Sequence, residues 1–585
     1  MKKLMLGNAA IAQGAWEAKA AFGSGYPGTP STEILEALAT YEGVVVQWAP
    51  NEKVGYEVSM GAVLAGERAL VTMKHVGLNV AADPFFSSSY MGVNGGLVVV
   101  SADDPGMHSS QDEQDNRSMA RAAKVIMVEP SDPEECRWMT REAFELSERF
   151  DSPVLVRLST RVCHMTGVVD TGEQVEWSSL GYKKRIAKNV LLPSHARSRR
   201  VEVQKRLEEA EAFADGSDLW NPIIRGSSEI GVVTSGVSFG YVREAVPDAS
   251  ILKLGLTHPL PMERIRRFAD SVEKLYVVEE LEPYIENAMR AAGIKVTAGR
   301  ESLPYTGEHN LTLVEQALLG KPKSSPTIDF GEEPLPGRPP TLCPGCSHRG
   351  VFSVFKEMKL RVMGDIGCYT LGALKPLAAM ESCMCMGASV GMAEGLELFG
   401  GPKEKGKTVG VIGDSTFFHS GITGLIDMIV HGSKATLVIL DNRWTAMTGS
   451  QPHPGTGKDI RGNDAPSLDV AQVCRSLGVK RVRVVNPYDL DEVKKVLEEE
   501  LAAEEVSVIV AKGPCVLGSR LPKGVPVEFH LENCDRCGAC IRVGCMAIHE
   551  KDGFPEVDPD LCTGCGVCAQ VCEQECIIAP SSKAN

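Results

Sequence analysis

The sequence predicts an α/β protein with several doubly wound parallel-sheet domains and a small C-terminal α+β domain. Short apolar runs alternate with helical patterns along most of the 585 residues, which is typical of parallel sheets covered by helices. An apolar share of 43% is enough for several separate cores at this length. Nine of the eighteen cysteines fall between positions 534 and 576, so the last domain is a unit of a different kind.

The alternation divides the chain into six segments. The apolar runs GVVVQWAP, RALVTMKHV, GGLVVVSADD, AAKVIMVEP and SPVLVRL predict strands of a first domain. IGVVTSG, ASILKLG and KLYVVEE predict a second domain, and KTVGVIGDSTFF, KATLVILDN, VKRVRVV and VSVIVAKG a third. A proline-rich stretch before the third domain reads as a linker. The segments are a first α/β domain (1–165), a connector (166–228), a second α/β domain (229–320), a linker (321–340), a third α/β domain (341–520) and the tail (526–585).

Composition excludes two classes of partner. A formal net charge of −15 argues against nucleic acid, which requires a basic face, and the basic run at 183–200 reads as a solvated part of the connector. No run reaches the roughly 18 to 20 apolar residues of a membrane span. The opening MKKLMLGNAAIAQGAWEAK is broken by polar residues and fits an amphipathic helix better than a signal peptide. We therefore expect a cytoplasmic protein whose clustered cysteines bind metals or carry out redox chemistry.

Two cysteine triplets dominate the tail. In CDRCGACIRVGC and CTGCGVCAQVC, three cysteines spaced C-x2-C-x2-C precede a fourth, which suits a [4Fe-4S] cluster whose fourth ligand comes from the other run. Zinc fits poorly because zinc sites use paired cysteines. The pattern resembles the bacterial two-cluster ferredoxin module, although the first run has one extra residue and proline follows neither fourth cysteine. The expected ligand sets are Cys534, Cys537, Cys540 with Cys572, and Cys562, Cys565, Cys568 with Cys545, with Cys576 as an alternative to Cys572.

The segment GDSTFFHSGITGLIDMIVHGSKATLVILDN predicts a magnesium site in the third α/β domain. A strand is expected to end at Gly413, Asp414 follows it, and Asn442 stands at the end of the next strand. Neighbouring parallel strands end at the same edge of a sheet, so both side chains should meet there. Mg²⁺ prefers such oxygen ligands together with diphosphate oxygens. The spacing resembles the magnesium-diphosphate motif of thiamine diphosphate enzymes, with Ser415 where many have glycine, whereas a simple turn is the alternative.

Three other segments resemble the 2-oxoacid:ferredoxin oxidoreductases. TAMTGSQPHPGTG resembles their TGGQ loop, which implies that Thr448, Gly449 and Gln451 line the diphosphate. YPGTPSTEI resembles their substrate-side loop and implies a substrate role for Thr29. NEKVGYEV places Glu52 at the position of the activating glutamate, which favours the cofactor tautomer that removes the thiazolium C2 proton. A glutamate on the surface of a helix is the alternative.

Three further residues in family-like motifs are candidates for the substrate site. His75 or His419 could lie near the substrate, and Arg117 could bind its carboxylate through two hydrogen bonds. The alternative for the histidines is a structural hydrogen bond in a tight loop.

The segment CPGCSHRG, residues 343–350, predicts a third metal site. In the 2-oxoacid:ferredoxin oxidoreductases a CPGC pair opens the cofactor domain and holds part of a cluster. The resemblance implies a third [4Fe-4S] cluster, completed by cysteines in GDIGCYTLG and KGPCVLGSR. A zinc knuckle and a redox dithiol are the alternatives for the pair. The implied ligands are Cys343, Cys346, Cys368 and Cys515, with Cys383 and Cys385 as alternatives.

Taken over nearly the whole chain, GDIGCYTLG, CMGASVGMAEG, ADDPGMHSSQDEQDNR, MKHVGLN and the tail resemble the α subunit of the indolepyruvate:ferredoxin oxidoreductases. The resemblance implies thiamine-enzyme-type domains: pyrimidine-binding, transketolase-C-like and diphosphate-binding, followed by a ferredoxin-like tail. It implies oxidative decarboxylation of arylpyruvates to aryl-acetyl-coenzyme A, with electrons passed to ferredoxin, and a separate smaller β subunit. The alternatives are a pyruvate or branched-chain substrate, a non-oxidative thiamine-dependent decarboxylase, and an electron-transfer subunit.

Overall fold

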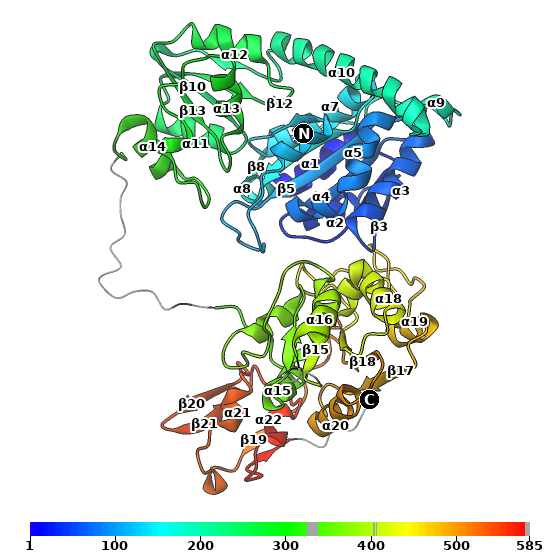
Figure 1. Cartoon of the computed structure of the whole chain (residues 1–585). Helices are drawn as coiled ribbons and strands as arrows, with labels where there is room; N and C mark the ends of the chain where they lie inside the picture. The colour runs from blue at the N-terminus through cyan, green and yellow to red at the C-terminus, as the bar shows by residue number, and fades with distance from the viewer. Residues whose placement is uncertain (324–336, 338, 402–403, 405, 580–585) are drawn as a thin grey trace. The chain divides into compact units, whose positions relative to one another are not determined.

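The computed structural model describes residues 1–323, 337, 339–401, 404 and 406–579. The chain forms two compact units, Met1–Phe330 and Gly331–Asn585. Most of the expected linker at 321–340 lies outside the described residues. Figure 1 shows the chain and labels many of the helices and strands of both units.

The first unit is built on a seven-stranded sheet with the order β12-β6-β7-β5-β4-β2-β3. All neighbours run parallel except β12 and β6. Every residue of β5 is buried, as expected for a parallel sheet covered on both faces. The five predicted apolar runs all form strands. The strands are β2 (Phe22–Gly25), β3 (Val45–Trp48), β4 (Ala69–Lys74), β5 (Leu97–Asp103), β6 (Ile126–Val128), β7 (Val154–Ser159) and β12 (Leu256–His258).

Helices connect these strands, and their starts show local capping. The side chain of Asn51 accepts from the backbone N–H of Val54 at the start of α3, and Asp132 accepts from Glu135 at the start of α7. The strands β1 (Lys2–Leu6) and β8 (Thr166–Asp170), which are far apart in the sequence, form a separate antiparallel pair. The helices are α1 (Gly7–Glu17), α2 (Thr32–Leu38), α3 (Glu52–Leu64), α4 (His75–Val80), α5 (Ala82–Met91), α6 (Arg117–Ala123), α7 (Pro133–Arg149) and α8 (Thr160–His164).

The first helix differs from the amphipathic one expected. Nearly all of α1 is buried, including the polar side chains of Gln13 and Glu17. Gln13 Nε2 donates to Glu17 over 2.9 Å, and Arg137 of α7 forms a buried ion pair with Glu17 at 2.7 Å. The polar residues that interrupt the apolar pattern therefore pair inside the fold instead of facing water.

The connector contains the long helix α10 (Pro193–Gly216) after the short α9 (Ile186–Asn189). Its basic run was expected to be solvated, and two of its residues are not. Lys188 Nζ lies 2.7 Å from Asp151 Oδ1, and Arg199 Nη2 lies 2.6 Å from Asp151 Oδ2. The shared carboxylate attaches the connector to the first domain, which the sequence pattern could not indicate.

The second α/β domain has a four-stranded sheet with the order β13-β10-β11-β9. The three predicted strands are parallel, and the short β9 is antiparallel to β11. The strands are β9 (Ile223–Ile224), β10 (Ser227–Ser235), β11 (Ala249–Leu254) and β13 (Lys274–Val278). The helices are α11 (Ser238–Ala245), α12 (Met262–Ala269), α13 (Tyr284–Ala291) and α14 (Leu311–Leu319).

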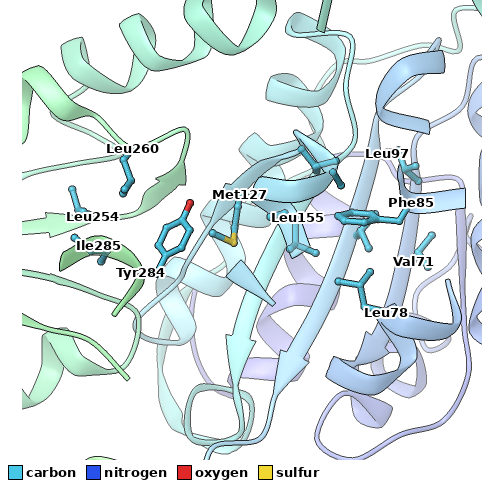
Figure 2. Close-up of a cluster of buried hydrophobic side chains, with 14 of the residues drawn as sticks. Val71, Leu78, Phe85, Leu97, Met127, Leu155, Leu254, Leu260, Tyr284 and Ile285 are labelled. Carbon is cyan, nitrogen blue, oxygen red and sulfur yellow. The ribbon is translucent and has the colours of Figure 1, made fainter. Parts of the chain in front are cut away.

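One hydrophobic core runs through both α/β domains of the first unit. Figure 2 shows Leu254, Leu260 and Tyr284 from the second domain together with Met127 and Leu155 from the first. The edge strand β12 leaves the second domain to pair with β6 of the first sheet. These two domains therefore share their stabilising apolar contacts.

The second unit begins with a five-stranded, all-parallel sheet of the order β14-β15-β16-β18-β17. The four predicted strands are present, and the short β14 was not anticipated. The strands are β14 (Arg361–Met363), β15 (Thr408–Gly413), β16 (Thr436–Asp441), β17 (Arg481–Val485) and β18 (Ser507–Lys512). The longer helices are α15 (His348–Glu357), α16 (Ala388–Phe399), α18 (Ile422–Val430), α19 (Val470–Ser476) and α20 (Leu490–Leu501).

The tail is a small α+β domain with two antiparallel pairs, β19–β22 and β20–β21. Cysteines make up much of its core, since Cys540, Cys562, Cys568 and Cys576 are buried together with a few aliphatic residues. Such a small core needs a further source of stability, which bound metal can supply. The elements are β19 (Glu528–Phe529), α21 (Ala539–Arg542), β20 (Ile548–Lys551), β21 (Phe554–Val557), α22 (Val567–Gln570) and β22 (Ile577–Ile578).

Candidate functional site

Asp414 and Asn442 lie at the carboxyl ends of the adjacent strands β15 and β16. Both side chains are buried. Asp414 Oδ2 accepts a hydrogen bond from the backbone N–H of Arg443 over 2.7 Å. Asn442 Oδ1 accepts one from Trp444 over 2.9 Å. The loop after β16 therefore orients both side-chain oxygens at one edge of the sheet.

The electrostatics of this edge favour negative charge at Asp414. Burial opposes that charge, but His453, whose Nε2 lies 3.1 Å from Asp414 Oδ2, lowers the pKa of Asp414. The neighbouring Asp441 has its pKa raised to about 6 by burial and by the charge of Asp414. Buried carboxylate oxygens next to an amide oxygen suit a hard divalent cation such as Mg²⁺.

Thr445 links the TGSQ loop to Ser415. Ser415 Oγ and Thr445 Oγ1 are 2.7 Å apart, and the backbone N–H of Thr445 donates to Gln451 over 3.0 Å. Within the loop, Thr448 Oγ1 donates to Gln451 Oε1 over 2.6 Å. Gly449 has a φ of 121°, which a side chain would rarely allow. The second unit thus brings together Gly413, Asp414, Ser415, Asn442, Thr448, Gly449 and Gln451.

Four cysteine thiols gather next to this edge. Burial and the thiols of Cys515 and Cys343 raise the pKa of Cys368 to about 11. Burial and the thiols of Cys368 and Cys343 likewise raise the pKa of Cys346 to about 12. Four neighbouring thiolates repel one another unless a metal supplies positive charge, so this group fits an iron–sulfur cluster.

The pKa values of the two alternative cysteines respond to Asp365 rather than to the four thiols. Cys383 and Cys385 are exposed, and Cys383 Sγ contacts the backbone oxygen of Asp365 at 3.6 Å. Their pKa values are raised by burial and by Asp365, without a contribution from Cys343, Cys346 or their neighbours. The geometry thus favours Cys368 and Cys515 over this pair.

In the tail, a small cavity has four cysteines in its lining, Cys545, Cys562, Cys565 and Cys568. Burial, followed by the thiols of Cys565 and Cys545, raises the pKa of Cys568 to about 12. A cavity bounded by four thiols fits a [4Fe-4S] cluster with one ligand from the first run and three from the second.

The other tail cysteines form a second group. The pKa of Cys540 is raised by burial and by the thiols of Cys572 and Cys534. Cys572 Sγ and Cys576 Sγ are only 3.3 Å apart, so both are close enough to serve as the fourth ligand. Cys537 is exposed at the loop.

In the first unit, the carboxyl edge of the seven-stranded sheet holds the other predicted residues. Glu52 is the first residue of α3 and only 4% exposed, which rules out the alternative of a surface glutamate. Its carboxylate packs against Gly77, where any Cβ would collide with it. The backbone oxygen of Thr29, after β2, accepts a hydrogen bond from Ser109 Oγ over 3.3 Å. His75 is the first residue of α4 and is fully buried, and its Nε2 lies 3.2 Å from the backbone oxygen of Asp112.

Lys74 is a residue of this edge that the sequence analysis did not single out. It is the last residue of β4, packs along Gly28 and donates from Nζ to the backbone oxygen of Ser109 over 2.9 Å. Among the described residues, no carboxylate lies within ion-pair distance of this ammonium. Burial lowers the pKa of Lys74, which nearby carboxylates only partly offset. The segment MKHVGLN could have indicated this residue, because it places a lysine at the end of a predicted buried strand.

Arg117 has a structural role that differs from the expected contact with a substrate carboxylate. Its guanidinium donates to Asp115 at 2.6 Å, to Glu279 at 2.7 Å and to the backbone oxygen of Glu280 at 2.6 Å. These buried contacts join the two α/β domains of the first unit. The side chain is therefore committed to protein partners 162 or more residues away in the second domain.

His419 lies in a π-helical turn at Phe417–Gly421, between Asp414 and α18. Its Nδ1 is 2.6 Å from Ser420 Oγ. Such turns within helices are frequent at functional sites, and this one places a buried histidine one turn from Asp414.

Three family models match the chain. They describe a pyruvate flavodoxin/ferredoxin oxidoreductase thiamine diphosphate-binding domain at residues 13–212, a C-terminal TPP-binding domain of thiamine pyrophosphate enzymes at 365–511, and a 4Fe-4S binding domain at 555–578. Indolepyruvate oxidoreductase subunit IorA of Archaeoglobus fulgidus is 38% identical over 98% of this chain and 97% of its own length. The same subunit of Methanothermobacter thermautotrophicus is 39% identical over 98% of this chain and 96% of its own.

This chain belongs to the family of indolepyruvate oxidoreductase IorA subunits. As an IorA-family member with thiamine diphosphate-binding and 4Fe-4S domains, it is a thiamine-dependent 2-oxoacid:ferredoxin oxidoreductase chain. The alternative of a simple electron-transfer subunit is therefore wrong. In the part of the IorA-family chain that the structure describes, no helix is long and apolar enough to cross a membrane.

Among solved structures, 2-oxoglutarate:ferredoxin oxidoreductase from Magnetococcus marinus matches 51% of this IorA-family chain and 61% of its own, at 18% identity and a TM-score of 0.42.

Proposed function

We propose that this chain, together with a smaller β subunit, catalyses the oxidative decarboxylation of arylpyruvates such as indolepyruvate and phenylpyruvate. The products are aryl-acetyl-coenzyme A, carbon dioxide and two electrons, which pass to ferredoxin. The observation that carries the oxidative reaction is the hydrogen bond from Cys515 N–H to Asn442 O at 3.0 Å, which joins a four-thiol site to the predicted diphosphate edge. The arylpyruvate substrate is supported by the names of the relatives.

Family matches support a role for three of the domains. We assign pyrimidine binding to 1–165, diphosphate binding to 341–520 and electron transfer to 526–585. The transketolase-C-like assignment of 229–320 rests on the resemblance of the sequence alone. Bound thiamine diphosphate supplies the electron sink that lets carbon dioxide leave. Mg²⁺ would be held by Asp414 and Asn442, whose oxygens share one sheet edge.

Protein side chains then orient the cofactor and substrate. Thr448, Gly449 and Gln451 would line the diphosphate, since Thr445 links their loop to Ser415, next to Asp414. Glu52 would hold the proton on the pyrimidine ring, because its carboxylate is buried at the start of α3.

The substrate side would use residues around the carboxyl edge of the first sheet. Thr29 and His75 flank the loop that contains Ser109 and Asp112. Lys74 replaces Arg117 as the residue that meets the substrate carboxylate, because its ammonium is half-buried and faces no carboxylate within ion-pair distance among the described residues.

Electrons would leave through three [4Fe-4S] clusters. The first would be held by Cys343, Cys346, Cys368 and Cys515, nearest the diphosphate edge. The second would occupy the cavity of Cys545, Cys562, Cys565 and Cys568. The third would be held by Cys534, Cys537 and Cys540 with Cys572 or Cys576.

The test is anaerobic co-purification with the β subunit, followed by viologen reduction with indolepyruvate, phenylpyruvate, pyruvate and 2-oxoglutarate, each with and without coenzyme A. We expect fast, coenzyme-A-dependent reduction with the two aryl acids. Faster reduction with pyruvate would reassign the substrate. Carbon dioxide release without viologen reduction would indicate a non-oxidative decarboxylase.

A further inference from the structure

The final residues of CPGCSHRG include a buried arginine that the proposed reaction does not use. Arg349 lies in the first turn of α15, directly after the CPGC turn, and is 3% exposed. A buried guanidinium needs hydrogen-bond acceptors on several sides, because its five N–H groups cannot be deprotonated. Its hydrogen-bond partners therefore show which segments the buried charge connects.

The guanidinium joins the CPGC loop to the tail. Nη2 donates to the backbone oxygens of Leu342 at 2.5 Å and Cys343 at 3.2 Å. Nη1 donates to the backbone oxygens of Val543 at 3.1 Å and Gly544. One side chain thus fixes the loop that carries Cys343 to the loop that leads into Cys545.

The same side chain borders the second cluster site. Arg349 and Gly345 line the same cavity as Cys545, Cys562, Cys565 and Cys568. Arg349 Nε is buried and has no hydrogen-bond partner among the residues that the structure describes. A cluster in this cavity would provide the sulfur acceptors that protein atoms do not.

The two cluster sites are in direct contact at this point. Gly345 of the CPGC turn has a φ of 70°, and a Cβ there would collide with the side chain of Thr563, next to Cys562. Tyr488 donates from its hydroxyl to the backbone oxygen of Gly345 over 2.9 Å. The CPGC loop and the tail therefore approach closely at Gly345, and Arg349 holds this junction through hydrogen bonds to both loops.

We propose that Arg349 is a positioning residue that couples the CPGC cluster to the cluster in the Cys545–Cys568 cavity. This inference rests on the proposed function, because it requires clusters at both sites. Each reduction adds one electron and no bond changes. A buried cation stabilises the more negative, reduced state of a nearby cluster and therefore raises its reduction potential. Arg349 makes the cavity cluster the favoured acceptor for electrons that leave the CPGC cluster.

Three variants separate charge from packing. Arg349→Gln removes the charge, whereas Arg349→Lys keeps it without the planar fork that reaches four backbone oxygens. Arg361→Gln is the matched control, because Arg361 lies in the same unit but pairs at the surface with Glu381 and Glu404. Each is purified with the β subunit, and its iron content is measured before an EPR-monitored redox titration.

We expect Arg349→Gln to retain its iron. The reduction potential of its cavity cluster should fall, so that the ratio of oxidised to reduced cluster at a given potential rises tenfold or more, about 59 mV for a one-electron couple. Arg349→Lys should recover most of that shift, and Arg361→Gln should match the unaltered protein. Unchanged potentials in Arg349→Gln with full iron would overturn the proposal. Loss of iron from both Arg349 variants, with unchanged potentials of the clusters that remain, would also overturn it, since Arg349 would then act through packing alone.

The same titration distinguishes this inference from the proposed function. If the unaltered protein contains about eight irons rather than about twelve, the CPGC cluster and with it the proposed electron route fail. If it contains about twelve irons and the Arg349 variants have the same reduction potentials as Arg361→Gln, the proposed function stands and the coupling role is wrong.

Discussion

The backbone N–H of Cys515 donates to the backbone oxygen of Asn442 over 3.0 Å, and Asn442 Nδ2 lies 3.3 Å from His348 of the CPGC motif. A backbone hydrogen bond between the ends of two neighbouring strands therefore joins a proposed cluster ligand to a proposed metal ligand. Burial lowers the pKa of His348 to about 4, so its imidazole is neutral at this junction. An electron leaving a cofactor at this edge would meet the four-thiol site directly.

Replacing Cys515 should remove one cluster without disturbing the other two. We expect Cys515→Ser to lower iron from about twelve to about eight per chain, because only the group with Cys343, Cys346 and Cys368 loses a ligand. Iron analysis with EPR checks this. Cys383→Ser is the control, since its thiol is exposed beside Asp365. Full iron in the Cys515 variant together with loss of iron in the Cys383 variant would show that Cys383, and not Cys515, is the cluster ligand.

Glu52→Gln should slow turnover by about a hundredfold or more, the contribution typical of a general acid–base group. Its carboxylate is buried, whereas Glu57 on the same helix is exposed and pairs with Lys53, so Glu57→Gln is the matched control. Viologen reduction is measured beside iron content, which should be unchanged in both. A rate in Glu52→Gln equal to that of the control would exclude Glu52 from the reaction.

Asp414→Asn should weaken thiamine diphosphate binding tenfold or more, at least about 1.4 kcal/mol. The reason is the loss of a buried anionic oxygen from the predicted Mg²⁺ site. Calorimetric titration with magnesium present measures the affinity, and Asp427→Asn, exposed on α18, is the control. Chelating magnesium should weaken binding to the unaltered protein much more than to the variant. Equal magnesium dependence in both would argue against a metal at Asp414.

Lys74→Gln should raise KM about tenfold or more for every 2-oxoacid tested, since all share the carboxylate. Burial lowers the pKa of Lys74, so its ammonium loses its proton at a lower pH than an exposed lysine does. KM of the unaltered protein should therefore rise as pH increases through that lowered pKa, and KM of the variant should not follow. Lys53→Gln, exposed on α3, is the control. A parallel rise of KM with pH in the Lys74 variant would assign the effect elsewhere.

Cys572 and Cys576 should be interchangeable as a cluster ligand, because their sulfurs are 3.3 Å apart. Either single alanine variant should retain about twelve irons, with a changed EPR signal only where the native ligand was removed. The double variant should lose about four. Loss of four irons in Cys572→Ala alone would show that Cys576 cannot replace it.

Strands that bury aliphatic side chains could be predicted from the sequence. Strands built from small residues, or from very short segments, could not. Runs such as GGLVVVSADD became β5, whereas β2 contains FGSG and is buried through small residues that make no apolar signal. The edge strand β12 escaped notice because three residues of the second domain pair with the first sheet. A pattern along the chain reports local burial, and it cannot report which neighbour provides that burial.

Cysteine spacing and the GD…N interval were readable because ligand geometry over a few residues, or across one strand–helix–strand crossover, is set by local backbone structure. The sequence by itself therefore predicted thiamine diphosphate and iron–sulfur clusters, which the family matches support, and it supplied the candidate ligands. Tertiary structure alone decided the partners of charged side chains. Arg117 pairs with Glu279 rather than facing a substrate, Lys74 is left without a carboxylate partner among the described residues, and Arg349 spans from Cys343 to Gly544. A charge is neutralised by whatever folding brings beside it, and that depends on packing between segments far apart in the chain.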